Sequence, residues 1–179
     1  MKRTALNFVV FQLGWLTTVI GAARGYPLAG VAAAAVAVGL HLWLAKDYGR
    51  ELALLIMAGL LGAFFDSALV QTGWLVYPNG ILIPGTAPYW IVCLWLLFTT
   101  TLNVSMRWLR GRPLLAIVFG AVGGPLSYLA GARLGALQFT DQAAAMVALA
   151  VGWAVMTPAL VWLAQRLDGI EPQAETQRA

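Results

Sequence analysis

The chain has 179 residues, of which 61% are hydrophobic and 10% are charged. Ordinary soluble domains are about 45–50% apolar and about 25% charged, so this composition argues against a soluble domain and indicates an integral membrane protein. Lys and Arg number 11 against 7 Asp and Glu, a net charge of +4. The basic residues lie between apolar runs, where membrane topology explains them better than nucleic-acid binding does.

Six apolar runs can be read as transmembrane helices, since a spanning helix needs roughly 20 mostly apolar residues. They predict an all-α polytopic membrane helix bundle that forms a single domain over residues 1–167. A short polar tail over 168–179 follows, which we expect to be disordered. The predicted spans are about 5–23, 27–45, 52–74, 88–108, 113–131 and 142–163.

Basic residues are distributed unevenly between the two sides of this predicted bundle. The side that holds both termini carries nine of the 11 Lys and Arg: Lys2, Arg3, Lys46, Arg50, Arg107, Arg110, Arg112, Arg166 and Arg178. The other side carries only Arg24 and Arg133. The positive-inside rule therefore predicts that both termini are cytoplasmic.

Asp66 is the candidate functional residue, because it lies in the otherwise uncharged run 52–74. A carboxylate inside a spanning helix costs about 2.5–3.5 kcal/mol on insertion scales, so it is expected to face the bundle interior and to find a partner. At a rise of ~1.5 Å per residue, Asp66 lies roughly 20 Å from the cytoplasmic boundary. Trp95, Ser127 and Tyr128 fall at about the same height, which predicts one polar and aromatic layer.

The third span continues this layer towards the next connector. Helical steps from Asp66 place Trp74 and Tyr77 on one stripe, which could line a cavity below the uncharged connector 75–88. Trp90 follows this connector, and both Trp74 and Trp90 also suit the aromatic belt of a membrane boundary. The predicted substrate-binding residues are Trp95, Ser127, Tyr128, Trp74, Tyr77 and Trp90.

Two interpretations of Asp66 stay open. In the structural one, Asp66 accepts hydrogen bonds from Ser127 and Tyr128 or pairs with Arg133, and only holds helices together. In the functional one, Asp66 is a candidate catalytic group, because charges within a membrane are by default functional.

The fifth span carries a stripe of small residues: Gly123, Ser127, Gly131 and Gly135 recur every four positions. Such a stripe allows close packing against a neighbouring helix. Pro125 alternatively opens the helix near its middle, so that free backbone groups face a ligand.

A second polar cluster is predicted nearer the cytoplasmic side, with Asn7, His41 and Asn103. His41 is the only histidine, so it suits an interfacial anchor or acid-base chemistry but not a multi-histidine metal site. The sequence has no phosphate-binding glycine loop, nucleotide fingerprint, nucleophile elbow or HExxH motif. No metal and no cofactor are predicted.

Several of these residues together form a pattern along almost the whole chain: Asn7, Phe11, Gln12, Trp15, Phe65, Asp66, Gly73, Tyr77, Pro88, Trp90, Leu94, Trp95, Gly123, Gly124, Pro125, Ser127 and Tyr128. The pattern resembles an uncharacterised family of small bacterial inner-membrane proteins that is catalogued as a domain of unknown function. The resemblance implies a multi-pass protein of the bacterial cytoplasmic membrane and supplies no catalytic residues. It also implies gene neighbours that resemble cyclopropane-fatty-acid synthases, and hence a link to membrane-lipid modification.

These observations predict that the protein binds a membrane lipid or acyl chain, or helps to modify it, in a cavity lined by Trp95, Asp66 and Tyr128. One alternative is an intramembrane enzyme in which Asp66 donates a proton to a polyene or isoprenoid. Another is a small proton-coupled transporter. The expected partners are membrane lipid and either a second copy of the chain or a lipid-modifying enzyme, with no nucleic acid.

Overall fold

The computed structural model describes residues 2–170. The elements in chain order are α1 (Lys2–Ala23), α2 (Leu28–Trp43), α3 (Tyr48–Gln71), β1 (Leu75–Val76), α4 (Tyr89–Leu102), the 3-10 helix η1 (Arg107–Leu109), α5 (Pro113–Arg133), β2 (Gln138–Phe139) and α6 (Gln142–Arg166). The predicted all-α class is confirmed, and a short ladder of two strands is added to it.

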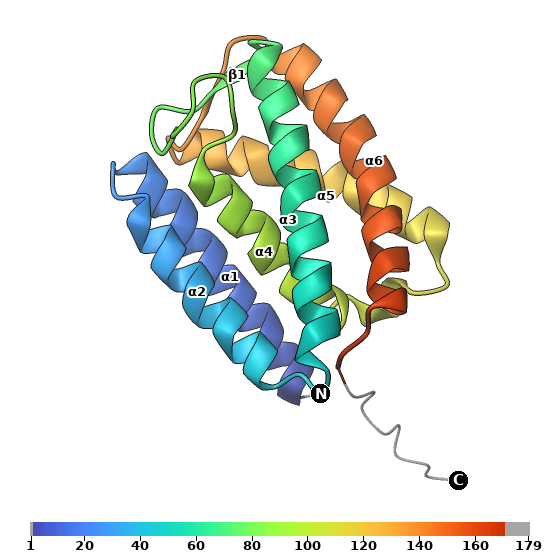
Figure 1. The fold of residues 1–179 in the computed structure, drawn as a ribbon. Coiled ribbons are helices and arrows are strands. Elements are labelled where there is room, and N and C mark those ends of the chain that lie inside the picture. Colours follow the sequence, from blue (N-terminus) through green and yellow to red (C-terminus); the bar gives the residue numbers. More distant parts are fainter. Residues whose placement is uncertain (1, 171–179) are drawn as a thin grey trace, which may run out of the picture.

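Two helix pairs flank a central helix. α1 packs on α2, α5 packs on α6, and α4 packs against α1, α2 and α3. In Figure 1, α5 passes behind α3 at a steep inclination and closes the back of the bundle beside α6. The start of α1 and the end of α6 lie at the same end of the bundle, as the sequence predicted for an even number of passes.

The central position of α4 follows from its sequence, which is apolar on all sides. A helix of this kind is buried rather than amphipathic, and Trp90, Trp95, Leu97 and Leu102 are each at most 2% exposed. The hydroxyl of Thr99 donates to the carbonyl of Trp95 over 2.7 Å, which satisfies a polar group within the helix itself.

The helix lengths revise two of the predicted spans. α2 has 16 residues and α4 has 14, which at ~1.5 Å per residue is shorter than the ~30 Å core of a bilayer. α4 ends at Leu102 and not near Trp108, because the Thr101 carbonyl accepts the amides of Val104 and Met106 and turns the chain. Four helices, α1, α3, α5 and α6, are long and apolar enough to cross a membrane; the count of six spans stays a prediction.

The small residues of α5 serve close packing within the bundle. A Cβ added to Gly120 would overlap the carbonyl of Trp153 on α6, and one added to Gly124 would overlap the indole ring of Trp153. Gly120 and Gly124 therefore pack closely on α6, whereas Gly123 of the predicted stripe meets only Phe119, at 4.0 Å, so close packing is not shown for the stripe as a whole. The alternative of a broken helix is wrong, since α5 continues as one helix from Pro113 to Arg133 with Pro125 inside it.

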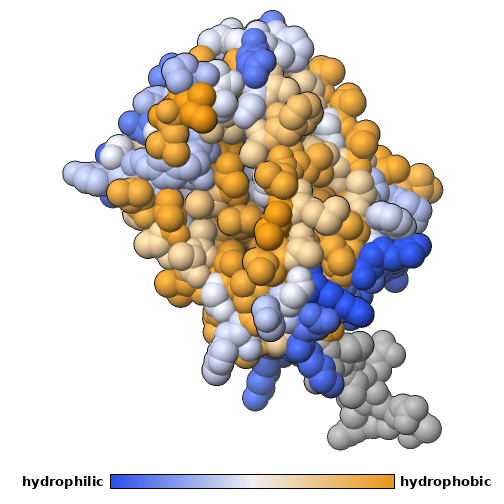
Figure 2. All heavy atoms as spheres, in the orientation of Figure 1, coloured by the Kyte–Doolittle hydropathy of each residue, from blue (hydrophilic) through white to orange (hydrophobic). Residues whose placement is uncertain are grey.

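The outer surface of the bundle is apolar over its middle. Figure 2 shows a wide hydrophobic band across one face, with hydrophilic residues gathered towards the two ends. Large exposed apolar side chains come from several helices, among them Val36, Leu60, Phe64, Leu114, Val147 and Val151. An exposed apolar belt of this extent suits contact with lipid chains better than contact with water.

Two segments that the sequence described as loop or tail are built into the fold. β1 pairs antiparallel with β2, so that Leu75 lies opposite Phe139. Asp168 and Gly169 were assigned to a disordered tail, but they contact the bundle through hydrogen bonds to Arg110 and Glu51. The predicted tail therefore begins at least three residues too early, and its residues 171–179 lie outside the described residues.

Candidate functional site

Asp66 lies on the buried face of α3, is 0% exposed and accepts three hydrogen bonds from aromatic side chains. The hydroxyl of Tyr128 donates to Oδ1 over 2.5 Å and that of Tyr77 over 3.2 Å. The indole Nε1 of Trp95 donates to Oδ2 over 2.7 Å. The predicted contacts of Asp66 with Trp95 and Tyr128 are thus present. They join α3 to α4 and α5.

A glycine on α3 makes the Trp95 contact possible. A Cβ added to Gly62 would overlap the ring of Trp95, and Gly62 precedes Asp66 by one helical turn on the same face. The ring of Trp95 therefore lies flat against the α3 backbone. This position directs its N–H to the carboxylate.

Tyr77 reaches Asp66 by a different route from the one the sequence predicted. α3 ends at Gln71, and Gly73 has a positive φ of 71°, so the chain leaves the helix before Trp74. The β1 strand then returns Tyr77 to the bundle. Trp74 does not join the layer; its carbonyl instead accepts the amides of Thr140 and Asp141 next to the strand ladder.

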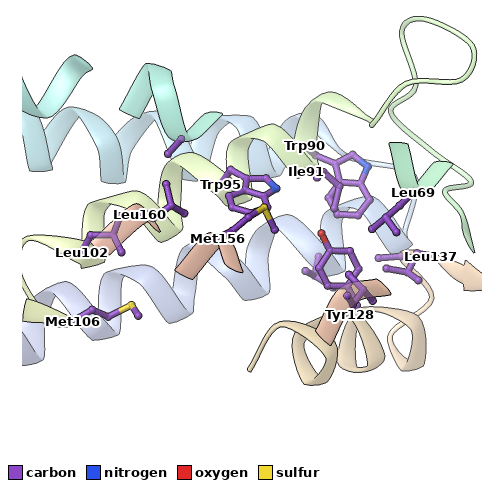
Figure 3. Packing of buried hydrophobic residues seen from close by; sticks show 14 of the residues in the cluster. Leu69, Trp90, Ile91, Trp95, Leu102, Met106, Tyr128, Leu137, Met156 and Leu160 are labelled. Carbon is purple, nitrogen blue, oxygen red and sulfur yellow. The ribbon is translucent and has the colours of Figure 1, made fainter. Parts of the chain in front are cut away.

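The connector that carries Tyr77 also fixes Trp90. The rings of Tyr77 and Trp90 meet edge to face with their centroids 5.4 Å apart. The indole N–H of Trp90 donates to the carbonyl of Asn79 over 2.9 Å, and Gly80 provides the space beside this ring. Figure 3 shows Trp90 and Trp95 extending from α4, with the Tyr128 hydroxyl directed towards the space between them.

Two predicted partners of Asp66 lie elsewhere. Ser127 accepts a hydrogen bond from the indole of Trp15 over 3.1 Å, which links α5 to α1. Arg133 is exposed at the end of α5. Within residues 2–170, no ion pair joins Asp66 to a basic side chain. The predicted alternative of an Asp66–Arg133 pair is therefore wrong.

A groove lies between α1 and α5 and opens to the outside of the bundle; we call it the lateral groove. Its volume is about 380 Å³ and no charged residue lines it. α4 and α6 form its floor with Phe98 and Trp153, and the exposed side chains of Phe8 and Leu126 stand at its edge. Gly123 faces open space here, so this residue of the small-residue stripe widens the groove, while Gly120 and Gly124 pack on α6.

A second, smaller space adjoins the lateral groove; we call it the inner cavity. Its volume is about 70 Å³. It shares five lining residues with the groove, namely Phe11, Trp15, Phe98, Ser127 and Trp153. Beyond the Trp15–Ser127 hydrogen bond it reaches Trp90, Trp95 and Tyr128. Four of the predicted binding residues, Trp90, Trp95, Ser127 and Tyr128, therefore line one space, whereas Asp66 contacts two of them from behind and does not line it.

The second polar cluster divides into two parts. His41 and Asn103 both contact Glu51: His41 Nε2 is 2.8 Å from Oε2, and the Asn103 side-chain amide donates to Oε1 over 2.7 Å. Asn7 takes no part and instead accepts the hydroxyl of Ser105 over 2.7 Å. The prediction of one cluster with Asn7, His41 and Asn103 is therefore wrong. His41 and Asn103 both contact Glu51, which was not predicted, and Asn7 forms its hydrogen bonds elsewhere.

Glu51 is the residue that the sequence analysis missed. It is 0% exposed and also accepts the backbone amide of Gly169 over 2.8 Å. Its position in the first turn of α3 suited an exposed acidic residue at a helix N-terminus. The sequence did contain a sign of its burial. Glu51, Leu55, Gly62 and Asp66 recur at one-turn or two-turn spacing, so they share one face of the helix.

Next to Glu51, two arginines bind the end of the described chain. Arg107 and Arg110 both form ion pairs with Asp168, at 3.0 Å and 2.8 Å, and Arg110 also donates to the side-chain carbonyl of Asn103. Burial and the Arg110 charge lower the pKa of the Arg107 guanidinium from its ordinary value, and the Asp168 carboxylate opposes both effects. The group clamps residues 168–170 to α3, α4 and η1.

The comparisons with known proteins identify a family but no function. No group of three or more His, Cys, Asp and Glu side chains that could hold a metal ion occurs within residues 2–170. No curated protein and no solved structure matches the chain. The profile of one family, described as "Protein of unknown function (DUF2878)", matches residues 4–159, a range that contains Asp66, its three donors and both spaces but excludes the Asp168 clamp. The chain belongs to the DUF2878 family.

Proposed function

We propose that this protein binds the acyl chain of a membrane lipid in the lateral groove. The groove carries the proposal: it is about 380 Å³ in volume, has no charged lining residue and is open at the side between α1 and α5. At roughly 10–15 Å³ for each water-sized group, this volume has room for about 25 or more such groups. That is enough for one long acyl chain.

The distribution of charge supports a membrane setting for this groove. Eight Lys and Arg lie in the segments at the end of the bundle that holds the start of α1 and the end of α6: Lys2, Arg3, Lys46, Arg50, Arg107, Arg110, Arg112 and Arg166. The opposite end has Arg24 and Arg133. By the positive-inside rule we place the first end in the cytoplasm, and from the family resemblance we propose that the membrane is a bacterial inner membrane.

The chemistry of the groove favours a lipid chain over a polar solute. Its walls are aromatic and aliphatic side chains and glycines, and its polar side chains are few, namely Gln12, Thr101, Ser105, Ser127 and Thr157. Asp66 lines neither the groove nor the inner cavity. Because a proton donor must come within hydrogen-bond reach of its substrate, the geometry gives no support to proton transfer from Asp66, in catalysis or in transport.

A pair of glycine variants tests the proposal. Gly123→Phe places a ring in the groove, where an added Cβ meets only Phe119 at 4.0 Å. Gly39→Phe makes the same change on α2, at an exposed position with nothing within 4 Å. Both proteins are purified in a mild detergent, and the lipid that each retains is counted by native mass spectrometry.

We expect the unchanged protein and Gly39→Phe to retain lipid in a fixed ratio and Gly123→Phe to lose it. Equal lipid retention by all three proteins would refute the proposal. A dimer that Gly123→Phe converts to a monomer, with no bound lipid in either form, would also refute it, since the groove would then hold a second copy of the chain.

A further inference from the structure

Two polar atoms beside the lateral groove have no hydrogen-bond partner within residues 2–170. They are the indole Nε1 of Trp153 and the hydroxyl Oγ1 of Thr157, both on α6 and both buried. Thr157 is 0% exposed, and both residues line the groove. Buried polar groups in folded proteins are nearly always hydrogen-bonded, so each unpaired one needs an explanation. Two such atoms in residues that line one groove are available to an occupant of that groove.

Neighbouring groups of the bundle do not satisfy either atom. A threonine hydroxyl within a helix often donates to the carbonyl four residues earlier, but Thr157 forms no such bond to Trp153. The Tyr128 hydroxyl lies near the Trp153 indole, but it donates its proton to Asp66 over 2.5 Å and forms no hydrogen bond with Nε1. Both groups therefore keep their full capacity to donate.

Two glycines of α5 lie next to these polar atoms. A Cβ added to Gly120 would overlap Thr157 Oγ1. One added to Gly124 would overlap Cδ1 of Trp153, the ring carbon that is bonded to Nε1. Both glycines also line the groove. Glycine at these two positions therefore keeps α5 side chains off the polar atoms of α6.

The chemistry of the two atoms defines the group that fits them. An indole N–H can only donate, whereas a carbonyl oxygen has two lone pairs and only accepts. One carbonyl oxygen can therefore accept from both Trp153 and Thr157. No charged residue lines the groove, and a buried carboxylate or phosphate without a cation is costly. The acceptor that fits is thus a neutral carbonyl.

The position of the two residues along α6 shows which part of a lipid would carry this oxygen. α6 runs from Gln142 to Arg166. At ~1.5 Å per residue, Trp153 lies roughly 16 Å from the first end and Thr157 roughly 13 Å from the second. The ester groups of a membrane lipid lie at the edges of the ~30 Å hydrocarbon core. A carbonyl that meets Trp153 and Thr157 therefore belongs to the chain and not to the ester.

From these observations we infer that the lateral groove binds a lipid whose chain carries a ketone oxygen near its middle, held by Trp153 Nε1 and Thr157 Oγ1. The inference rests on the proposed function, since it specifies the kind of acyl chain that the same groove takes. A plain hydrocarbon chain would cover both donors without pairing them, whereas an oxo chain supplies the missing acceptor.

Octadecanoic acid and its 6-oxo, 10-oxo and 14-oxo derivatives form a matched set of probes. They share chain length and head group, and they differ in the presence and position of one ketone. Binding of each to the purified protein in detergent is measured by native mass spectrometry. We expect one oxo acid to bind about tenfold more tightly than octadecanoic acid, the gain expected from two hydrogen bonds to buried donors.

The two proposals fail in different ways. Equal affinities for all four acids, each lost in Gly123→Phe, would overturn the ketone inference and leave the acyl-chain proposal standing. Binding of none of the four would overturn both. A carbon-13 label in the ketone adds a spectroscopic test, because hydrogen bonding lowers the C=O stretching frequency. We expect a shift to lower frequency on binding, and an unshifted band for a bound oxo acid would contradict the inference.

A pair of valine variants locates the donors. Thr157→Val removes the unpaired hydroxyl and is expected to weaken binding of the preferred oxo acid several fold more than binding of octadecanoic acid. Thr99→Val is the matched control: Thr99 is also buried, but its hydroxyl donates to the Trp95 carbonyl over 2.7 Å and it lines neither space. The control should keep the preference for the oxo acid.

Trp153→Phe tests the second donor and decides the matter even if Thr157→Val does not fold. The variant keeps an aromatic ring and removes the N–H, so the preference for the oxo acid and the shift of its C=O band should both decrease. A parallel loss for both acids would show that Trp153 only shapes the groove. That result, full retention of the preference by either variant, or loss of the preference in Thr99→Val, would overturn the assignment.

Discussion

Helix α3 carries two fully buried carboxylates whose surroundings differ in kind. Glu51 accepts hydrogen bonds from Asn103 and Gly169 and contacts His41, and Arg107 and Arg110 lie close by around Asp168. Asp66 accepts hydrogen bonds from three aromatic side chains and has no ion-pair partner within residues 2–170. Glu51 thus belongs to a group that contains positive charges, whereas Asp66 is held only by aromatic hydrogen-bond donors.

The two carboxylates hold different parts of the fold. The contacts of Glu51 come from α2, from the segment after α4 and from residues 168–170, so they fasten chain segments together. The contacts of Asp66 orient Trp95 and Tyr128, which line the inner cavity. Changes at the first carboxylate should therefore affect mainly stability, and changes around the second should affect both stability and the shape of the inner cavity.

The largest expected effect follows from Glu51→Ala. The substitution leaves the Asn103 amide and the Gly169 N–H buried without an acceptor, and removal of one member of a buried charged group costs about 3–5 kcal/mol. Thermal unfolding in detergent should show a large fall in stability. Arg24→Gln, at an exposed position, is the control and should change little. A loss below about 1 kcal/mol for Glu51→Ala would show that the group is not structural.

Gly62→Ala changes the surroundings of the other carboxylate, Asp66, without changing the carboxylate itself. The added methyl overlaps the Trp95 ring, so the indole must leave Asp66, and overpacking of this kind costs about 1–3 kcal/mol. Gly59→Ala is the matched control on the same helix, since its Cβ meets the flexible end of Leu96 at 3.0 Å. We expect Gly62→Ala to lower stability by more than Gly59→Ala does. Similar results for the two alanine variants would mean that the position of Trp95 is unimportant.

Tyr77→Phe removes the longest of the three hydrogen bonds to Asp66, at 3.2 Å. The expected loss is about 1 kcal/mol, since the remaining two donors still satisfy both carboxylate oxygens. Tyr128→Phe, which removes the 2.5 Å bond, should cost more. Unfolding measurements that reverse this order would show that the connector, and not α5, holds the carboxylate.

The smallest effect is expected for Asp168→Asn. The ion pairs of Asp168 with Arg107 and Arg110 are partly exposed, and such pairs contribute up to about 1 kcal/mol. Unfolding in low and high salt should show that this contribution is screened. A loss as large as that of Glu51→Ala would place the whole clamp, rather than Glu51, at the centre of the group.

Sequence reasoning located the helices and part of the site because those features depend on local pattern. Long apolar runs specify helices, and counting residues along them brought Asp66, Trp95 and Tyr128 to one height. The ends of α2 and α4 were missed because turns such as the one closed by the Thr101 carbonyl depend on neighbouring segments. They leave little trace in an apolar sequence.

The burial of Glu51 was missed for a related reason. A glutamate in the first turn of a helix is usually explained by the helix dipole, and nothing local shows that Gly169, far along the chain, returns to cover it. Tyr77 was predicted to reach Asp66 along the helix for the same reason. It reaches Asp66 because the β1 strand returns the chain to the bundle, and helical spacing does not describe such a return. Contacts that form where the chain reverses its direction can be identified only from the folded structure.

The most direct test of lipid binding in the lateral groove is photo-crosslinking in bilayers. A phospholipid with a diazirine on its acyl chain is reconstituted with the protein, and labelled residues are identified by peptide mass spectrometry. The account predicts that labels concentrate on groove residues of α1 and α5, such as Gln12, Gly123 and Leu126, and that Gly123→Phe removes them. Labelling spread evenly over outward positions such as Val36 and Phe64, and unchanged by Gly123→Phe, would contradict it.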